Sequence, residues 1–483
     1  MSDSIARNPA VAEEKVPERD PETGAKAWSW DEDDNNPYNW PKWKKNVQLI
    51  SIASVAFTGS LATSIISPSH EQLMTEFGVS STVAFLPLTT YVIALGLGPV
   101  FGGPLSETAG RQAVWLMATV LGGIFFAGSG GAPTFAGLCV MRFLAGFFYG
   151  PSLAIGSGVL AEVYAPAERG PPASLYTLSP FLGPGLGPVI GVFVTDRMGW
   201  RWTQYTLVFF SIFGMFWVLI AGETYHLVLQ RRRMKKLGLE PPPQKPISET
   251  VKEFATIGLF RPIHMMLTEP IVGFLCLYVA CIFGILFNFF GTFFYIFESV
   301  YHFTVEQSGL VFLAIAGGCL AGIGIVGFCN KVLYQAQVDR YPLHQVPPEH
   351  RLYAAMFGSI ALPTSLFWFA WACRQDVHPA IPIVAIFLFG MGNICLFISA
   401  MQYLGDVYHR TNVASAASAN SFARYLLGAV FPLFCLQMYQ RLGINWATSL
   451  LGFVTLAQLP LPWLLFKFGK TVRDKSKYQT ASY

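Results

Sequence analysis

Residues 112–141 read QAVWLMATVLGGIFFAGSGGAPTFAGLCVM, a stretch without a single charged side chain. A helix on the surface of a soluble protein needs a polar face, and this stretch cannot supply one. Residues 442–466 are equally free of charge, and residues 46–106 hold no lysine or arginine and only two acids, Glu71 and Glu76. Such long gaps in charge indicate segments whose solvent is lipid.

The composition of the whole chain supports this interpretation. Of its 483 residues, 53% are apolar and 12% are charged, about half of the 25% charged residues that soluble domains carry. A membrane-spanning helix takes about 20 apolar residues, so the apolar residues suffice for about twelve crossings. This balance argues against a soluble enzyme, a disordered protein and a disulfide scaffold. The net charge of +4 is small, and no basic helix interleaved with aromatic residues suggests nucleic-acid binding.

The sequence therefore predicts an all-α integral membrane protein with twelve spans in two bundles of six. The expected spans are 46–68, 83–104, 112–131, 134–162, 171–195, 202–222, 270–297, 307–330, 353–373, 379–402, 413–439 and 444–466. The expected domains are a disordered tail (1–45), a first bundle (46–222), a central loop (223–269), a second bundle (270–466) and a C-terminal tail (467–483). An internal repeat is weak, because the loop after the eighth span shares only Gly327 and Lys331 with the loop after the second.

The lysines and arginines fix the expected orientation. If both termini are cytoplasmic, the outer loops hold four of these residues, two more lie within spans, and the other 26 are on the cytoplasmic side. The opposite orientation would reverse this bias and break the positive-inside rule.

The loop GPLSETAGR, residues 103–111, is the first motif that suggests function. Gly103 and Gly110 would let the backbone turn tightly between two spans. Glu107 and Arg111 are four residues apart, the spacing of a helical ion pair, and an acid here could also face the N-terminus of a neighbouring helix. We expect a latch that holds the cytoplasmic side closed, with an ordinary polar turn as the alternative.

Two arginines lie inside spans, where a charge costs about 3 kcal/mol or more. Arg142 belongs to RFLAG (142–146) in span 4, and Arg424 lies in span 11. Glu162 lies 20 residues beyond Arg142, about 30 Å along the same helix, and so cannot be its direct partner. Arg142 could be functional or simply paired to carbonyl groups, and the same two roles remain open for Arg424.

Span 5 contains GPGLGPVIG, residues 183–191. Gly183, Gly187 and Gly191 line one helix face and allow another helix to approach closely. Pro188 removes a backbone hydrogen bond and bends the helix. The functional hypothesis is a bend and gasket between the two halves, and the alternative is ordinary close packing.

No carboxylate lies near the middle of any expected span, so a proton site would have to use Glu162, a histidine such as His70, or the influence of Arg142. The cavity is expected to be apolar and aromatic. Its candidate residues, each of which could instead serve ordinary packing, are Tyr91, Asn288, Phe289, Phe290, Asn393, Phe397 and Arg424.

No cofactor, metal site or catalytic cluster is expected. The glycines at 322, 324 and 327 match a dinucleotide pattern but lie inside an apolar span. The GKT at 469–471 lacks the upstream glycine of a phosphate-binding loop. These observations argue against an enzyme and against transport driven by ATP through this chain alone.

The three motifs resemble those of the major facilitator superfamily: GPLSETAGR its loop 2–3 signature, RFLAG its span 4 arginine motif, and GPGLGPVIG the span 5 motif of drug:proton antiporters. Four further stretches of the sequence are similar to those of the fungal twelve-span drug:proton antiporters. These stretches are NPYNWPKW (36–43), GWRW (199–202), ETY (223–225) and AVFPLF (429–434). Glu107 and Glu162 depart from the pattern, since aspartate is usual at both positions.

The resemblance implies proton-coupled export of organic compounds, such as drugs, fungicides or secondary-metabolite toxins, across the plasma membrane. Arg142 would then relay protons with Glu162, and span 5 would be the antiporter helix. The expected partners are a small organic substrate, protons and membrane lipid, and the chain is expected to be monomeric. An uptake symporter or facilitator of a small polar solute remains the alternative, followed by a membrane enzyme or receptor.

Overall fold

The computed structural model describes residues 29–165, 168–239, 260–338, 340–341, 346–408, 410–478 and 480. Within these ranges the chain forms helices and short connections, and its only β pairing is an isolated bridge between Tyr408 and Thr480. Ten helical segments in the same ranges are long and apolar enough to cross a membrane. The chain is therefore all-α, as its composition predicts.

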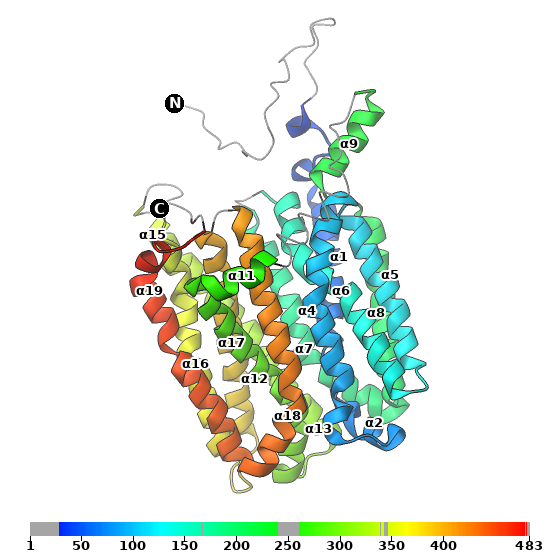
Figure 1. The fold of residues 1–483 in the computed structure, drawn as a ribbon, viewed down its shortest axis with the longest axis vertical. Helices are drawn as coiled ribbons and strands as arrows, with labels where there is room; N and C mark the ends of the chain where they lie inside the picture. Colours follow the sequence, from blue (N-terminus) through cyan, green and yellow to red (C-terminus); the bar gives the residue numbers. More distant parts are fainter. Residues whose placement is uncertain are drawn as a thin grey trace, which may run out of the picture.

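The first half forms one bundle of six long helices (Figure 1). They are α1 (Lys42–Leu61), α4 (Leu86–Thr108), α5 (Arg111–Gly130), α6 (Phe135–Val163), α7 (Gly170–Met198) and α8 (Trp200–Ala221). Short helices connect or flank them: η1 (Trp30–Glu32), η2 (Pro37–Asn39), η3 (Ser67–Ser69), α2 (His70–Phe77), α3 (Ser81–Ala84) and α9 (His226–Lys236).

The second half forms a similar bundle beside the first. Its long helices are α12 (Pro270–Tyr301), α14 (Phe312–Phe328), α16 (Tyr353–Ala372), α17 (Ala380–Val407), α18 (Arg410–Gln458) and α19 (Pro460–Arg473). Its short helices are α11 (Arg261–Thr268), α13 (Val305–Leu310), η5 (Cys329–Tyr334), α15 (Gln335–Val338) and η6 (Pro348–Leu352).

The number of crossings agrees with twelve. The long helix α18 turns at Gly443, whose φ of 73° is not helical, so the segment that ends with α19 crosses twice. The ten apolar segments thus make eleven crossings, and the more polar α1 makes the twelfth. The last expected span is interrupted at Leu459, because Pro460 cannot donate the backbone hydrogen bond that would continue the helix.

The two bundles repeat one pattern of helix packing. In the first, α4 and α5 pack on α6, and α1 packs on α7. In the second, α14 and α16 pack on α17, and α12 packs on α18. These are equivalent positions in chain order, so a repeat that the sequence hardly shows is clear in the fold.

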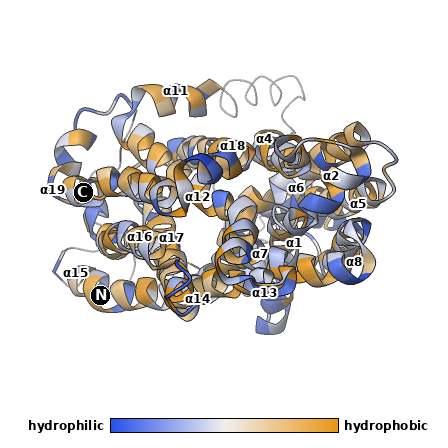
Figure 2. Cartoon of the chain, turned by 90° about the horizontal axis from the view of Figure 1, so that it is seen from below, coloured by the Kyte–Doolittle hydropathy of each residue, from blue (hydrophilic) through white to orange (hydrophobic). Residues whose placement is uncertain are grey.

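The halves meet along two seams. α4 packs against α18, and α7 packs against α14 (Figure 2). We call the end of the molecule that carries η1, α9 and the end of α19 the terminal face, and the end that carries α2 and α13 the far face (Figure 1).

Two of the polar segments contain more helix than expected. Residues 30–40, assigned to the tail, include η1 and η2, and Asp33 forms an ion pair of 2.8 Å with Arg233 of α9. The central loop contains α9 and α11, while its residues 240–259 lie outside the described ranges, as do residues 1–28 of the tail.

Candidate functional site

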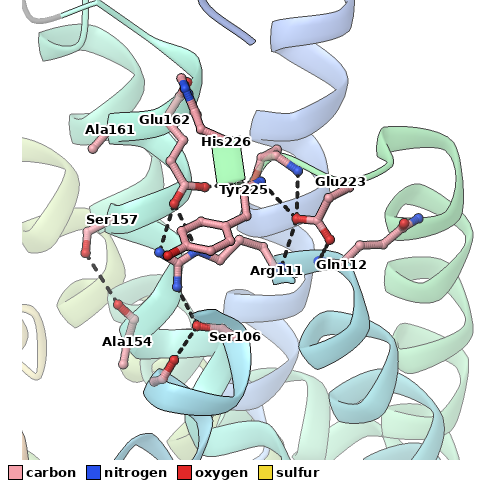
Figure 3. A network of polar contacts seen from close by, with 12 residues as sticks. Ser106, Arg111, Gln112, Ala154, Ser157, Ala161, Glu162, Glu223, Tyr225 and His226 are labelled. Atoms are coloured by element: carbon pink, nitrogen blue, oxygen red, sulfur yellow. Dashed lines mark hydrogen bonds and ion pairs between the residues drawn. The ribbon is translucent and has the colours of Figure 1, made fainter. Parts of the chain in front are cut away.

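A polar network joins four helices at the terminal face (Figure 3). Arg111 begins α5, and its backbone N–H donates to Oε1 of Glu223 at 2.9 Å, while the N–H of Gln112 donates to Oε2 at 3.3 Å. A carboxylate at a helix N-terminus satisfies free amide groups and complements the helix dipole. Gly110 makes this approach possible: its φ is 98°, and a Cβ there would collide with the Glu223 carboxylate.

The side chain of Arg111 binds a second acid in the same network. Its Nη2 and Nε lie 2.8 and 3.0 Å from Oε1 of Glu162 at the end of α6. The guanidinium also donates to Ser106 of α4 and lies 4.8 Å from the ring centre of Tyr225. Burial raises the pKa of the Tyr225 phenol, so that ring stays neutral beside the pair. The ends of α4, α5, α6 and α8 are thereby held together.

The network differs from the predicted latch in two residues. Gly110 and Arg111 belong to it, but α4 continues to Thr108, so Gly103 is helical and makes no turn. Glu107 is exposed and lies in a different helix from Arg111, which is why the expected pair four residues apart does not form. The acid that faces the N-terminus of α5 is Glu223, whose only sign in the sequence was its place in ETY (223–225).

The second half has a corresponding network. Arg351, just before α16, forms an ion pair of 2.7 Å with Asp406 near the end of α17. Its guanidinium carbon lies 3.8 Å from the ring centre of Tyr334. Nearby, Glu349 forms an ion pair with Arg473 at the end of α19. Both bundles are thus closed by arginine–carboxylate pairs at the terminal face.

Arg142 is fully buried inside the first bundle. Its Nη2 donates to the carbonyl of Ala62 at 2.6 Å, its Nε to Pro87 at 3.2 Å, and its Nη1 to Oε1 of Gln204 at 3.1 Å. It therefore ties α6 to the chain next to α1, to α4 and to α8. As expected, Glu162 is not its partner, since Glu162 binds Arg111.

Tyr91 belongs to the same buried cluster. The guanidinium carbon of Arg142 lies 4.6 Å from its ring centre, and its hydroxyl donates to the Gly59 carbonyl at 2.7 Å. Tyr91 is completely buried. The expectation that it lines a cavity is therefore wrong in this structure, because the ring packs within one bundle.

The glycine stripe of α7 faces α1 of the same bundle. A Cβ at Gly183 would collide with Ser60, one at Gly187 with Ser64, and one at Gly191 with the carbonyl of Ile65. These glycines thus allow close packing inside the first half, and the predicted gasket between the halves is not where they lie. It is Gly185 that faces Ala316 of α14 instead.

Pro188 adds a polar contact to this packing. Because it has no N–H, it leaves the carbonyl of Pro184 without its helical partner. Ser64 of the segment after α1 donates to that carbonyl at 3.2 Å. The proline therefore strengthens the contact between α7 and the end of α1.

The middle of the molecule contains an aromatic cage where the halves meet. Phe181 of α7 lies 4.8 Å from Phe397 of α17 and 5.7 Å from Phe283 of α12, measured between ring centres. The guanidinium carbon of Arg424 on α18 lies 4.7, 4.9 and 4.5 Å from the ring centres of Phe283, Phe397 and Tyr425. Of the predicted cavity residues, Phe397 and Arg424 reach this interface.

The other candidates lie inside the second bundle. Phe289 is buried among Phe293, Phe369 and Phe389, so it packs the bundle and does not line a cavity. Asn288 donates to Tyr439 at 3.5 Å. Asn393 lies one helical turn from Phe397, donates to the Ile282 carbonyl at 3.2 Å, and has an Oδ1 atom without a partner. The sequence did not reveal Phe181, because phenylalanine is frequent in every span.

Contacts across the seams close the far face. Thr82 is hydrogen-bonded to Gln437, and Thr89 donates to the Ala429 carbonyl at 2.9 Å. Gly309 of α13 packs on Val192 of α7, and Gly291 of α12 packs on Phe85. These contacts join α3, α4 and α7 of the first half to α12, α13 and α18 of the second.

The face of α4 that packs on α18 is open toward the terminal face. Gly96 packs tightly on Tyr425 of α18, whereas a Cβ at Gly103, two turns further, would meet nothing within 4 Å. Glu107, one turn beyond, is exposed. The aromatic cage therefore lies between a closed far face and a looser terminal face.

Comparison with known proteins gives a consistent picture. The sequence profile of the Major Facilitator Superfamily matches residues 52–432. Polyamine transporter 4 of Saccharomyces cerevisiae is 34% identical, over 94% of this chain and 73% of the yeast protein. The ascochitine biosynthesis cluster transporter of Didymella fabae is 34% identical, over 94% and 89% of the two chains. A multidrug transporter of Aspergillus fumigatus is 36% identical, over 94% and 76%.

A solved structure shares the fold. The structure of the proton:xylose symporter XylE, bound to 6-bromo-6-deoxy-D-glucose, matches with a TM-score of 0.63 and 13% sequence identity, over 89% of this chain and 96% of that one. At such low identity, the likeness concerns the arrangement of helices alone.

Proposed function

Because this chain belongs to the major facilitator superfamily, we propose that it is a proton-coupled efflux transporter that exports amphipathic or aromatic organic compounds across the plasma membrane. The observation that carries the proposal is the aromatic cage around Arg424, where the two bundles meet. Transporters built from two repeats bind substrate at this interface. The names of the Didymella and Aspergillus relatives, a metabolite-cluster transporter and a multidrug transporter, support compounds of this kind.

We place the terminal face in the cytoplasm. The lysines and arginines of α9 lie there, in agreement with the positive-inside rule. With this orientation, the closed far face is extracellular, and a compound from the cytoplasm would approach the cage from the looser side. A single chain supplies every residue of the cage, so a monomer would suffice.

For proton coupling, we propose Glu162 as the group that exchanges the proton. It is the only acid of α6, and its ion pair with Arg111 would be lost on protonation, which would loosen the network at the terminal face. Arg142 would support this step by keeping α1, α4, α6 and α8 aligned. A gradient of one pH unit supplies about 1.4 kcal/mol per proton, and 100 mV adds about 2.3 kcal/mol.

Inside-out plasma-membrane vesicles from a host without its own pumps would test the function. With an imposed proton gradient, we expect the vesicles to accumulate an azole but not a hexose, and a protonophore should stop accumulation even when ATP is present. Vesicles from the same host without this chain are the control. Accumulation that depends on ATP and survives the protonophore, or hexose uptake without azole transport, would contradict the proposal.

A further inference from the structure

We infer that the compounds carried by this chain bear a carboxylate on an aromatic body, and that Arg424 binds this carboxylate. The inference rests on the proposed function, because it names the substrate class for the same cage.

Arg424 carries a buried charge that the described residues do not fully supply with hydrogen-bond acceptors. The side chain is 9% exposed, its Nε has no hydrogen-bond partner, and no acid of the described residues forms an ion pair with it. Three rings surround it, but a cation–π contact contributes only about 0.5–2 kcal/mol. A charge at this depth costs about 3 kcal/mol or more. The guanidinium edge therefore remains available to a ligand.

Arg142 shows what a structural arginine looks like in the same chain. Each of its three nitrogen atoms donates to a protein oxygen, from Ala62, Pro87 and Gln204. Arg424 has aromatic rings where Arg142 has acceptors. A planar guanidinium binds a carboxylate through two parallel hydrogen bonds, which would supply the missing acceptors.

The surroundings of Arg424 favour an aromatic anion over a cation. Phe181 completes the cage from the other half, so a flat ring could stack there while its carboxylate binds Arg424. The acids within the described long helices lie within the last four residues of those helices, namely Glu107, Glu162, Asp196, Glu298 and Asp406. An ammonium group in the cage would thus meet a positive charge and no carboxylate, which disfavours the polyamine named for the yeast relative.

Binding of three matched probes to the purified full-length protein tests the inference. The probes are 2-naphthoic acid, methyl 2-naphthoate and 2-naphthylmethylamine, which share one ring system and differ in charge. Titration calorimetry at pH 7 should show the carboxylate binding at least about tenfold tighter than the ester, with the ammonium weakest, since a hydrogen bond to a charged group is worth about 1.5–3 kcal/mol.

Substitutions on α18 make the test specific. Arg424→Gln should weaken naphthoate binding about ten- to a hundredfold and abolish the preference for the acid over the ester, and Arg424→Lys should keep part of the preference. Arg441→Gln removes an exposed charge from the same helical segment and should change nothing. Ester binding by Arg424→Gln also verifies that the variant is folded.

Equal binding of acid and ester by the wild type, no binding of any probe, or an unchanged preference in Arg424→Gln would overturn the inference. If Arg424→Gln does not fold, the wild-type comparison still decides. Gradient-driven azole export without a preference for the acid would refute the substrate class but leave the exporter intact. Tight naphthoate binding without any gradient-driven export would refute the exporter but leave the arginine site.

Discussion

Arg111 at the start of α5 holds the carboxylate of Glu162 at the end of α6, with 2.8 Å between Nη2 and Oε1. The two residues are 51 positions apart in the sequence, and Arg351 and Asp406 repeat the relationship in the second half at 55 positions. Each pair ties the third and fourth long helices of its bundle at the terminal face. Neither pair crosses between the halves, so each holds together the end of its own bundle.

The Arg111–Glu162 pair should show strong energetic coupling. Both side chains are mostly buried, at 13% and 14% exposure, so removing either one leaves the other charge without its partner. In a double-mutant cycle of Arg111→Gln and Glu162→Gln, we expect a coupling of about 1–3 kcal/mol in thermal unfolding. Both single variants should also lower gradient-driven export in vesicles.

The exposed pair Arg374–Asp376 is a matched control, with side chains 56% and 70% exposed. Exposed pairs contribute little, so its coupling should be about 0–1 kcal/mol. Equal coupling for the two pairs would show that the Arg111–Glu162 contact does not hold the terminal face together.

Arg142→Ala should abolish export and lower the unfolding temperature. The substitution removes the donors to the Ala62 carbonyl and to Oε1 of Gln204, while the Pro87 carbonyl keeps a 3.4 Å bond from the Thr90 hydroxyl. Each buried acceptor left unpaired costs about 1–3 kcal/mol. Arg142→Lys should rescue export only in part, because an ammonium group cannot reproduce the planar set of donors. Arg197→Ala, an exposed position at the far end of α7, should behave as the wild type. Normal export by Arg142→Ala would show that these contacts are dispensable.

Alanine at the α7 stripe should destabilise the first bundle in a graded way. A Cβ at Gly187 meets the Ser64 hydroxyl, which can rotate, whereas one at Gly191 meets the backbone carbonyl of Ile65, which cannot move alone. We expect the free energy of unfolding to fall by about 1–3 kcal/mol, and by more for Gly191→Ala than for Gly187→Ala. Thermal unfolding of the purified protein measures this loss.

Gly324→Ala provides the control for this series. Gly324 lies in α14, where a Cβ would meet nothing within 4 Å. Alanine is favoured over glycine in a helix by about 0.5–1 kcal/mol, so this variant should be as stable as the wild type or slightly more stable. A Gly191→Ala variant as stable as Gly324→Ala would contradict the close contact between α7 and α1.

His70 should make the far face sensitive to acid. Its ring stacks on Phe85 at 4.3 Å between ring centres, and Phe85 packs on Gly291 of the other half. Burial lowers the pKa of His70 below its usual 6.5. The folded state thus prefers the neutral ring, and its contribution to stability is complete above about pH 6.5 and is lost as the pH falls through the lower folded-state pKa.

Thermal unfolding at pH 7.5 and pH 5.0 would measure this effect. We expect the unfolding temperature of His70→Gln to lie below that of the wild type at pH 7.5, with a smaller difference between the two proteins at pH 5.0. His378→Gln, an exposed histidine, should show the same small difference at both pH values. A wild-type advantage that grows toward pH 5.0 would contradict the assigned role.

The sequence by itself determined the membrane-spanning character and the twelve crossings. These are local properties: a helix in lipid needs about 20 apolar residues, and the runs at residues 112–141 and 442–466 meet that need without reference to any other part of the chain. The cost of a charge in lipid also marked Arg142 and Arg424 as important before any contact was known.

Only the tertiary structure decided which residues meet. The sequence could not tell that Arg111 binds Glu162 and not Glu107, that the α7 glycines face α1, or that Tyr91 and Phe289 pack within bundles. Nor could it separate Arg142, whose three nitrogen atoms all donate to protein oxygens, from Arg424, whose Nε has no partner. In lipid, the buried and the lipid-facing sides of a helix are both apolar, so the pattern of hydrophobic residues does not reveal which side faces a partner; the close packing of neighbouring helices decides it.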